Sequence, residues 1–160
     1  MICPSCKSDM IVVEYNKIEL DYCTTCQGVW FDFGELELLL ESLSLESPNL
    51  FFSNILDSEE AKSSERKRRC PTCGRKMKKT ILGQQPGTGQ QPGTGQQPPI
   101  LIDACRRGDG LWFDGGELGQ LIKQIAGEPL EKAGSPHQVA AFLGEVFQGW
   151  EQTGEQEGSV

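Results

Sequence analysis

The stretch that decides the fold is Cys3-Pro4-Ser5-Cys6, followed after sixteen residues by Cys23-Thr24-Thr25-Cys26. Two thiolates at positions i and i+3 of a tight turn can point at one ion, and a second such turn across a hairpin completes a tetrahedron. Zinc prefers such a set of sulfur ligands, although four thiolates also suit iron. Because four sulfurs leave no open coordination position, the pattern predicts a closed, structural metal site whose binding energy stabilises the fold.

The same pattern recurs further along the chain. Cys70-Pro71-Thr72-Cys73 repeats the first turn at an offset of 67 residues, and Cys105 repeats Cys23 at an offset of 82. The run Trp30-Phe31-Asp32 returns at the same offset of 82 as Trp112-Phe113-Asp114. Self-similarity of this kind predicts two tandem modules, the second of which contains an insertion of 15 residues.

Each copy is expected to form a β-hairpin. β-forming side chains dominate residues 10–15 and 18–22 in the first copy, and residues 77–82 and 100–104 in the second. The insertion lies at about residues 83–99 and repeats Gln, Pro, Gly and Thr. Since it has no large apolar side chains to bury, we expect it to be a disordered loop.

A helix is expected after each hairpin. Asp32-x-x-Glu35 and Asp114-x-x-Glu117 are close to the capping-box pattern that begins a helix. Apolar residues continue through Leu43 in the first copy and Ile125 in the second. A further helix is predicted to begin near Ser135-Pro136, with one apolar face that ends at Trp150.

The fold class expected from these features is a small metal-stabilised α+β protein. It would contain two tandem zinc ribbons, each a β-hairpin followed by an α-helix, and a C-terminal amphipathic helix. The apolar share of 37%, with 19 Gly and 9 Pro, argues against one large core. The expected boundaries are 1–45 for the first ribbon and its helix, 46–69 for a charged linker, 70–127 for the second ribbon, 128–150 for the C-terminal helix region and 151–160 for a disordered tail.

The second set of ligands lacks a cysteine, because Gly108 stands where Cys26 stands in the first copy. Asp109, one residue later, could reach the ion if the neighbouring glycines reshape the turn. The single histidine, His137, is another candidate, and a water ligand or an empty site are the remaining alternatives. An open three-thiolate site would suit Lewis-acid zinc, but no recognisable motif places a general base, so we expect no enzyme. The predicted metal ligands are Cys3, Cys6, Cys23, Cys26, Cys70, Cys73, Cys105 and Asp109.

The pattern Cys-Pro-x-Cys … Cys-x-x-Cys-x-Gly-x-Trp-x-Asp-x-Gly-Glu-Leu resembles the bacterial zinc-ribbon family named after the transcription factor IIB zinc finger. The resemblance covers residues 1–41 and, allowing for the insertion, residues 70–123. It implies that the cysteines of both copies bind metal, and similar sequences often place histidine or aspartate at the position of Asp109. The family name implies transcription, but a shared motif does not by itself establish a function.

Charge is segregated along the chain. Residues 1–65 carry 3 basic and 13 acidic side chains, residues 66–107 carry 10 and 1, and residues 108–160 carry 2 and 9. The basic cluster predicts contact with nucleic-acid phosphates. The alternative is a protein–protein adaptor that uses the C-terminal helix and the acidic flanks; a redox protein or metalloenzyme is a third hypothesis. The candidate basic patch is Arg66, Lys67, Arg68, Arg69, Arg75, Lys76, Lys78, Lys79, Arg106 and Arg107.

Two further expectations concern the tryptophans and the cellular compartment. Trp30 and Trp112 are expected to pack over their own ribbons and the helices that follow, rather than to serve as exposed stacking platforms. Met1 is followed by neither a basic start nor an apolar run, and no window approaches the about 20 apolar residues of a membrane span. We therefore expect a cytoplasmic protein, in which paired cysteines bind metal rather than form disulfides.

Overall fold

The computed structural model describes residues 1–42, 44, 52–82 and 99–126. We call residues 1–42 the N-terminal unit and residues 70–126 the C-terminal unit. The predicted C-terminal helix, His137 and nearly all of the low-complexity insertion lie outside the described residues.

Both predicted hairpins are confirmed. In the N-terminal unit β1 (Ile11–Tyr15) pairs antiparallel with β2 (Ile18–Tyr22). The turn residues Asn16 and Lys17 both have positive φ, 47° and 65°, which is the backbone of a two-residue turn that matches the twist of its strands. In the C-terminal unit β4 (Lys78–Leu82) pairs with β5 (Ile100–Ala104) in the corresponding register.

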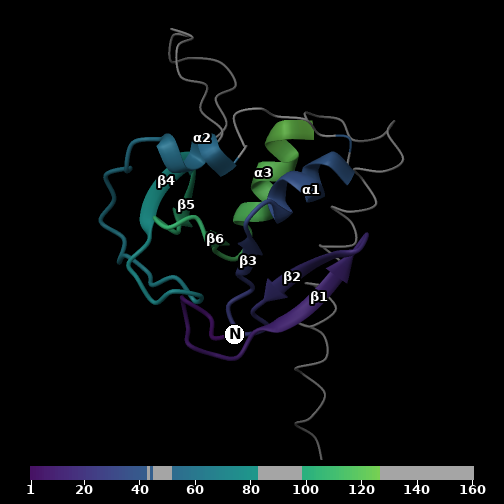
Figure 1. Ribbon diagram of the computed structural model, residues 1–160, viewed down its shortest axis with the longest axis horizontal. Coiled ribbons are helices and arrows are strands. Elements are labelled where there is room, and N and C mark those ends of the chain that lie inside the picture. Colours follow the sequence, from purple (N-terminus) through teal and green to yellow (C-terminus); the bar gives the residue numbers. More distant parts are fainter. Residues whose placement is uncertain (43, 45–51, 83–98, 127–160) are drawn as a thin grey trace, which may run out of the picture.

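A third strand in each unit, which the sequence reading missed, joins the two units into one sheet. These strands are β3 (Val29–Asp32) and β6 (Gly110–Phe113), and they contain the repeated Trp-Phe pair. They pair antiparallel, with Trp30 opposite Trp112 at the centre of the register. The result is a six-stranded sheet in the order β1-β2-β3-β6-β5-β4 (Figure 1). The hairpin-plus-helix description of each copy is therefore incomplete.

The predicted helices follow the third strands. α1 (Glu35–Ser42) and α3 (Glu117–Ala126) each begin at the Glu of the Asp-x-x-Glu motif, and this Glu supplies one half of the expected capping box. The Asp32 N–H donates to Glu35 Oε2 at 2.8 Å, and the Asp114 N–H donates to Glu117 Oε2 at 2.7 Å. A short helix, α2 (Phe52–Asp57), precedes the C-terminal unit and was not predicted.

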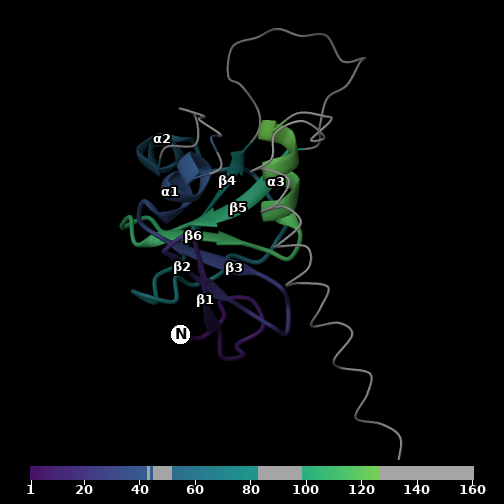
Figure 2. The same ribbon diagram turned by 90° about the vertical axis from the view of Figure 1, so that its right-hand side faces the viewer.

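The helices and the sheet enclose one apolar core. The helices lie on one side of the sheet, and the first metal-binding turn lies on the other (Figures 1 and 2). Phe31 and Phe113 meet edge to face across the junction of the units, with ring centroids 5.4 Å apart. Both units contribute to this core, so burial of apolar surface couples their stabilities. Its largest fully buried members are Tyr22, Phe31, Phe113, Leu39, Ile55, Ile100 and Ile102.

The charged segment of residues 58–69, the second half of the predicted linker, contains no helix. It runs alongside β4, where the Ala61 N–H donates to the Lys79 carbonyl at 2.8 Å. Its own opposite charges pair, since Glu60 forms salt bridges with both Lys67 and Arg106. The acidic part of the segment therefore packs against the chain's own basic region.

None of the described helices is long and apolar enough to cross a membrane.

Candidate metal centres

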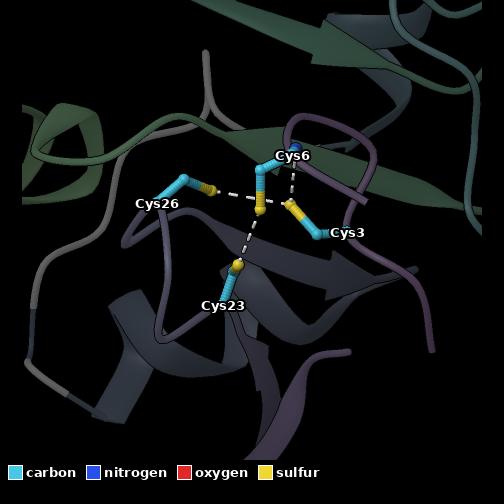
Figure 3. Close-up of side chains that lie close together, drawn as sticks. All are labelled: Cys3, Cys6, Cys23 and Cys26. Atoms are coloured by element: carbon cyan, nitrogen blue, oxygen red, sulfur yellow. Dashed lines mark hydrogen bonds between the residues drawn. The ribbon is translucent and has the colours of Figure 1, made fainter. Parts of the chain in front are cut away.

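The four cysteines of the N-terminal unit converge on one point (Figure 3). The sulfurs of Cys3 and Cys26 are 3.5 Å apart, and those of Cys6 and Cys23 are 3.4 Å apart. All four sulfurs lie within 4.8 Å of one another. These separations are far longer than a disulfide bond of about 2.05 Å, so the cluster is a set of four separate thiols.

The local backbone explains why the first turn aims its sulfurs inward. The Lys7 N–H donates to the Cys3 carbonyl at 3.1 Å, and Lys7 itself has a φ of 69°. The backbone N–H groups of Ser5 and Cys6 both point at the Cys3 sulfur at 3.4 Å. Such donors stabilise a thiolate, so the turn is preorganised for a negatively charged ligand.

The C-terminal unit brings its three cysteines together with Asp109. The sulfurs of Cys73 and Cys105 are 3.6 Å apart. Asp109 Oδ2 lies 3.2 Å from the Cys105 sulfur and 3.5 Å from the Cys70 sulfur. The ligand atoms of all four residues lie within 4.8 Å of one another, as in the first centre. The structure thus brings Asp109 to the three cysteines, whereas His137, the other candidate, lies outside the described residues.

A shift of the turn by one residue accounts for the position of Asp109. In the N-terminal unit the Gln27 N–H closes the turn on the Cys23 carbonyl, and Gln27 has a φ of 62°. In the C-terminal unit the Gly108 N–H closes it on the Cys105 carbonyl, and the positive φ of 87° falls on Gly108. The turn closes one residue earlier, so the side chain of the next residue is directed at the three sulfurs. Glycine tolerates this φ without strain.

Both clusters fit a tetrahedral zinc ion. With a zinc–sulfur distance of about 2.3 Å, two ligands of a regular tetrahedron lie about 3.8 Å apart, close to the shortest sulfur pairs here. Burial raises the pKa of the thiols of Cys3, Cys26, Cys70 and Cys105. Each cluster contains two of these thiols, which do not ionise together readily without a compensating cation, and a divalent metal supplies that charge.

The two tryptophans fill the space between the centres. Trp30 and Trp112 are both fully buried, and they share an apolar cluster with cysteines of both units. Each indole covers a glycine of the opposite unit: a Cβ on Gly28 would lie 2.1 Å from Trp112, and one on Gly110 would lie 2.6 Å from Trp30. Packing is therefore their role, but each ring also covers the opposite unit, and neither belongs to the apolar cluster that contains the helices. This exchange depends on the β3–β6 pairing, which local sequence patterns do not reveal.

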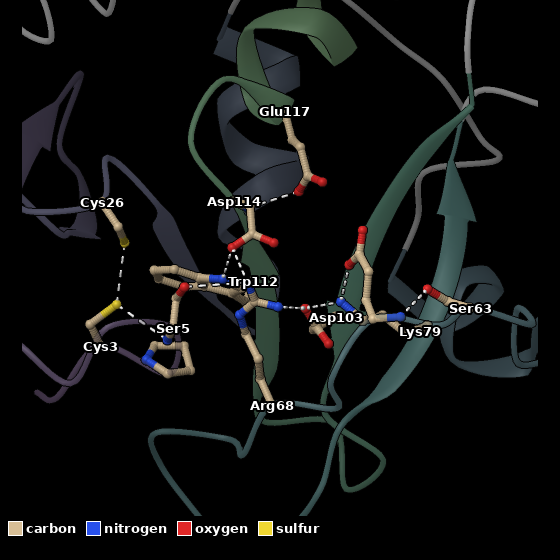
Figure 4. Close-up of polar contacts among 12 residues, drawn as sticks. Cys3, Ser5, Cys26, Ser63, Arg68, Lys79, Asp103, Trp112, Asp114 and Glu117 are labelled. Carbon is tan, nitrogen blue, oxygen red and sulfur yellow. Dashed lines mark hydrogen bonds and ion pairs between the residues drawn. The ribbon is translucent and has the colours of Figure 1, made fainter.

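A buried polar network, also missed, ties the segment of residues 58–69 to the sheet (Figure 4). Lys79, which is 1% exposed, donates to Asp103 Oδ2 and to Glu65 Oε2, each at 2.9 Å. Arg68 bridges Asp103 at 3.7 Å and Asp114 at 2.9 Å, and it donates to Ser5 Oγ at 3.3 Å. One signal in the sequence could have revealed this network. Lys79 and Asp103 carry opposite charges at positions that face each other in the predicted hairpin.

The predicted basic patch divides into two groups. Five of its members are engaged internally: Lys67, Arg68, Lys79 and Arg106 in salt bridges, and Lys78 with backbone carbonyls. The other five are exposed and, among the described residues, form no salt bridge, although Arg69 donates to the Gly74 carbonyl: Arg66, Arg69, Arg75, Lys76 and Arg107. Four of these flank the turns that carry the cysteines of the second centre. Arg69 and Lys76 face each other in an antiparallel bridge.

Comparison with known proteins supports the assignment of the N-terminal unit. Residues 2–42 match the sequence model of the family described as Transcription factor zinc-finger, a zinc ribbon. Searches of the curated proteins and of the solved structures found no match. The family match and the two ligand clusters together are consistent with zinc as the cofactor of this chain, in one or two sites, and they identify residues 2–42 as a zinc-ribbon segment.

Proposed function

We propose that this chain is a non-enzymatic binding module scaffolded by two zinc ions, and that it contacts nucleic-acid phosphates through the C-terminal unit. The observation that carries the proposal is the exposed basic group Arg66, Arg69, Arg75, Lys76 and Arg107, which we call the knuckle cations. Four of them lie beside the turns of the second centre, so the metal would fix their relative positions. The family match, whose description names a transcription factor, points to the same class of partner.

The second zinc, in this proposal, is held by Cys70, Cys73, Cys105 and Asp109. Four protein ligands leave no coordination position for a substrate, so the metal is structural. The Glu117 carboxylate accepts from the Asp114 N–H, and the Asp114 carboxylate binds Trp112 Nε1 and Arg68. Because these contacts commit both carboxylates, they argue against the metalloenzyme hypothesis.

The salt dependence of binding tests the proposal. With zinc-loaded full chain and a fluorescent single-stranded or duplex DNA, four or five phosphate contacts should give a log–log slope of about −3 to −4.5. Engagement of all ten basic residues would give a slope of about −7 to −9, and would mean that the internal salt bridges open. Absence of binding at low salt would contradict the proposal.

A matched pair of variants separates the knuckle cations from the internally paired ones. Arg75→Gln combined with Lys76→Gln should reduce the slope by about 2, because two phosphate contacts are lost. Lys67→Gln, whose ammonium already pairs with Glu60, should leave the slope nearly unchanged. Equal effects of the two changes would indicate attraction by net charge rather than by a defined surface.

A protein–protein adaptor is the second candidate. One part of the acidic flanks, residues 58–65, packs against the chain's own basic region through Glu60 and Glu65. The C-terminal helix of that hypothesis lies outside the described residues. What favours an adaptor instead is an open edge of the sheet in the N-terminal unit.

A further inference from the structure

The two edge strands of the sheet, β1 and β4, differ in whether another described segment covers them. At one edge, β4 is covered by residues 58–69: the Ala61 N–H donates to the Lys79 carbonyl, and Glu65 pairs with the Lys79 ammonium. One backbone hydrogen bond and this ion pair hold the segment beside β4, and Arg68 reaches two carboxylates. The chain thus contains its own example of an arginine-bearing segment docked beside this type of edge.

At the other edge, β1 offers the corresponding position without such a cover. Val12 pairs with Asp21 as Lys79 pairs with Asp103, so the Val12 carbonyl points away from β2 just as the Lys79 carbonyl points away from β5. The Val12 side chain is 62% exposed. No other described segment hydrogen-bonds to the Val12 backbone. An edge strand with unpaired backbone groups is a template for an added strand.

The carboxylates beside this edge define the chemistry of the occupant. Asp21 and Asp32 are the counterparts of Asp103 and Asp114, the two residues that bind Arg68. Asp32 Oδ1 accepts from Trp30 Nε1 as Asp114 Oδ1 accepts from Trp112 Nε1. Neither Asp21 nor Asp32 forms a salt bridge with another described residue.

The N-terminal unit has no arginine of its own at this place. Met1 is the counterpart of Arg68, since the Met10 N–H donates to the Met1 carbonyl as the Met77 N–H donates to the Arg68 carbonyl. The methionine side chain is uncharged and 46% exposed. The charge of the Met1 α-ammonium acts on Asp21, but this ammonium forms no salt bridge with Asp21 or Asp32. A side chain that bridges both carboxylates, as Arg68 does in the other unit, would therefore come from another segment.

We propose that the β1 edge of the N-terminal unit is a docking site for an extended, arginine-bearing segment of a partner protein. The segment adds alongside β1, places an apolar residue on Val12 where Glu65 meets Lys79, and sets an arginine against Asp21 and Asp32. A second copy of β1 is a poorer occupant, since it would bring Glu14 and its neighbouring acids against their own copies. Nucleic acid is repelled by the same carboxylates, so this surface is distinct from the knuckle cations.

A peptide made from the chain's own docked segment is the appropriate probe. We would use a fluorescent peptide of residues 58–69 that carries Glu65→Leu to suit Val12, and titrate it with zinc-loaded full chain at low salt. Binding should raise the anisotropy and shift the amide NMR signals of β1. Asp21→Asn in the protein should weaken binding at least about 10-fold, whereas Glu41→Gln, which removes a charge from α1 on the other face, should change it less than about 2-fold.

Val12→Lys provides a second variant, because Val12 is exposed and this change should not disturb the fold. The lysine would repel the incoming arginine and should also weaken binding at least about 10-fold. The proposal is overturned if the peptide does not bind, if Asp21→Asn and Glu41→Gln bind it equally, or if the shifts are confined to β4 and β5. The last result would mean that the peptide only displaces the segment already bound there.

Discussion

The N-terminal unit surrounds its metal position with four cysteines, whereas the C-terminal unit uses three cysteines and an aspartate. The backbones of the two turns differ by one residue in where they close, and the positive φ moves from Gln27 to Gly108. A lost ligand was thus accompanied by a change in local backbone that directs a neighbouring side chain to the same place. The comparison teaches that a CxxC motif can lose a cysteine and keep a four-ligand cluster if glycine supplies the turn.

The units also differ in what covers the metal-facing side of their hairpins. Lys79 and Asp103 form a buried ion pair under residues 58–69, while their counterparts Val12 and Asp21 remain partly exposed. Similarly, Arg69 faces Lys76 beside the second centre, where the first unit has Ile2 facing Asp9. Two copies of one backbone therefore present surfaces of opposite charge, and this difference supports the assignment of different partners to them.

The largest expected effect comes from breaking the first centre. Cys23→Ser should remove its zinc and, because β3 pairs with β6, also unfold the C-terminal unit. The physical reason is that structural zinc contributes about 10–16 kcal/mol of apparent binding free energy, more than a small domain's net stability. Amide NMR spectra and zinc content would check this. A variant with unchanged C-terminal signals would show that the two units fold independently.

The exchange of tryptophans between units predicts the next largest effect. Gly110→Ala should destabilise the protein by about 2–4 kcal/mol, since the added Cβ would lie 2.2 Å from the Phe31 carbonyl oxygen as well as against Trp30. Gly119→Ala in α3 is the matched control, because a Cβ there meets nothing within 4 Å. It should stabilise by about 0.5–1 kcal/mol through helix propensity. Chemical denaturation with zinc present measures the free energy of unfolding of both variants. Equal effects would contradict the close approach of Trp30 and the Phe31 carbonyl to Gly110.

The buried ion pair gives the sharpest contrast between counterpart residues. Asp103→Ala should cost about 3–5 kcal/mol, because it leaves the Lys79 ammonium buried with only the exposed Glu65 as partner. Asp21→Ala, at the same register position in the first unit, should cost less than about 1 kcal/mol. Denaturation midpoints of the two variants provide the test. Similar losses of stability would mean that residues 58–69 contribute little to the burial of the Lys79–Asp103 pair.

The shifted turn predicts changes of opposite sign at two positions. Gly108→Ala should destabilise the zinc-loaded protein by about 1–2 kcal/mol, because an L-residue is strained at a φ of 87°. Gln27→Gly should relieve strain at the corresponding bend and stabilise by up to about 1 kcal/mol. Thermal unfolding in excess zinc would compare them. A neutral Gly108→Ala would argue against the proposed closure of the turn.

The smallest effect concerns pH and the two capping glutamates. Burial, together with the charge of Asp114, raises the pKa of Glu117 to about 7 from 4.5, and burial also raises the pKa of Glu35. A raised carboxyl pKa means that the folded state binds the proton more tightly, so stability falls as pH rises from about 4.5 through 7. Glu117→Gln should therefore flatten this slope by on the order of 1 kcal/mol between pH 6 and 8. Glu35→Gln is the comparison variant. If both variants changed the pH dependence of stability equally, the two capping glutamates would not differ as expected.

Local features of the fold were predictable because they depend on neighbouring residues. The hairpins follow from β-forming residues on either side of Asn16-Lys17, and the helix starts follow from the spacing of Asp and Glu. The cysteines converge for the same reason, since each pair sits on one turn. The candidate Asp109 was also accessible, because its neighbour Gly108 marked the missing ligand.

Features that depend on long-range pairing were not predictable in this way. Residues Val29–Asp32 directly precede a predicted helix, and they form a strand because they pair with Gly110–Phe113. The crossing of Trp30 and Trp112 follows from that pairing, as does the shared core. Likewise, a run of basic residues does not reveal which of them face carboxylates from residues 58–65. Charge counts in sequence therefore overestimated the free positive surface.

The metal content of the native full chain tests the central claim most directly. Native mass spectrometry combined with zinc X-ray absorption should show two zinc ions per chain, with an average first shell of 3.5 sulfurs and 0.5 oxygens or nitrogens at about 2.0–2.3 Å. Asp109→Ala should lower the occupancy of the second site and leave the first filled. One zinc per chain with four sulfur ligands would contradict the account, because Cys70, Cys73, Cys105 and Asp109 would then lie together without holding a metal.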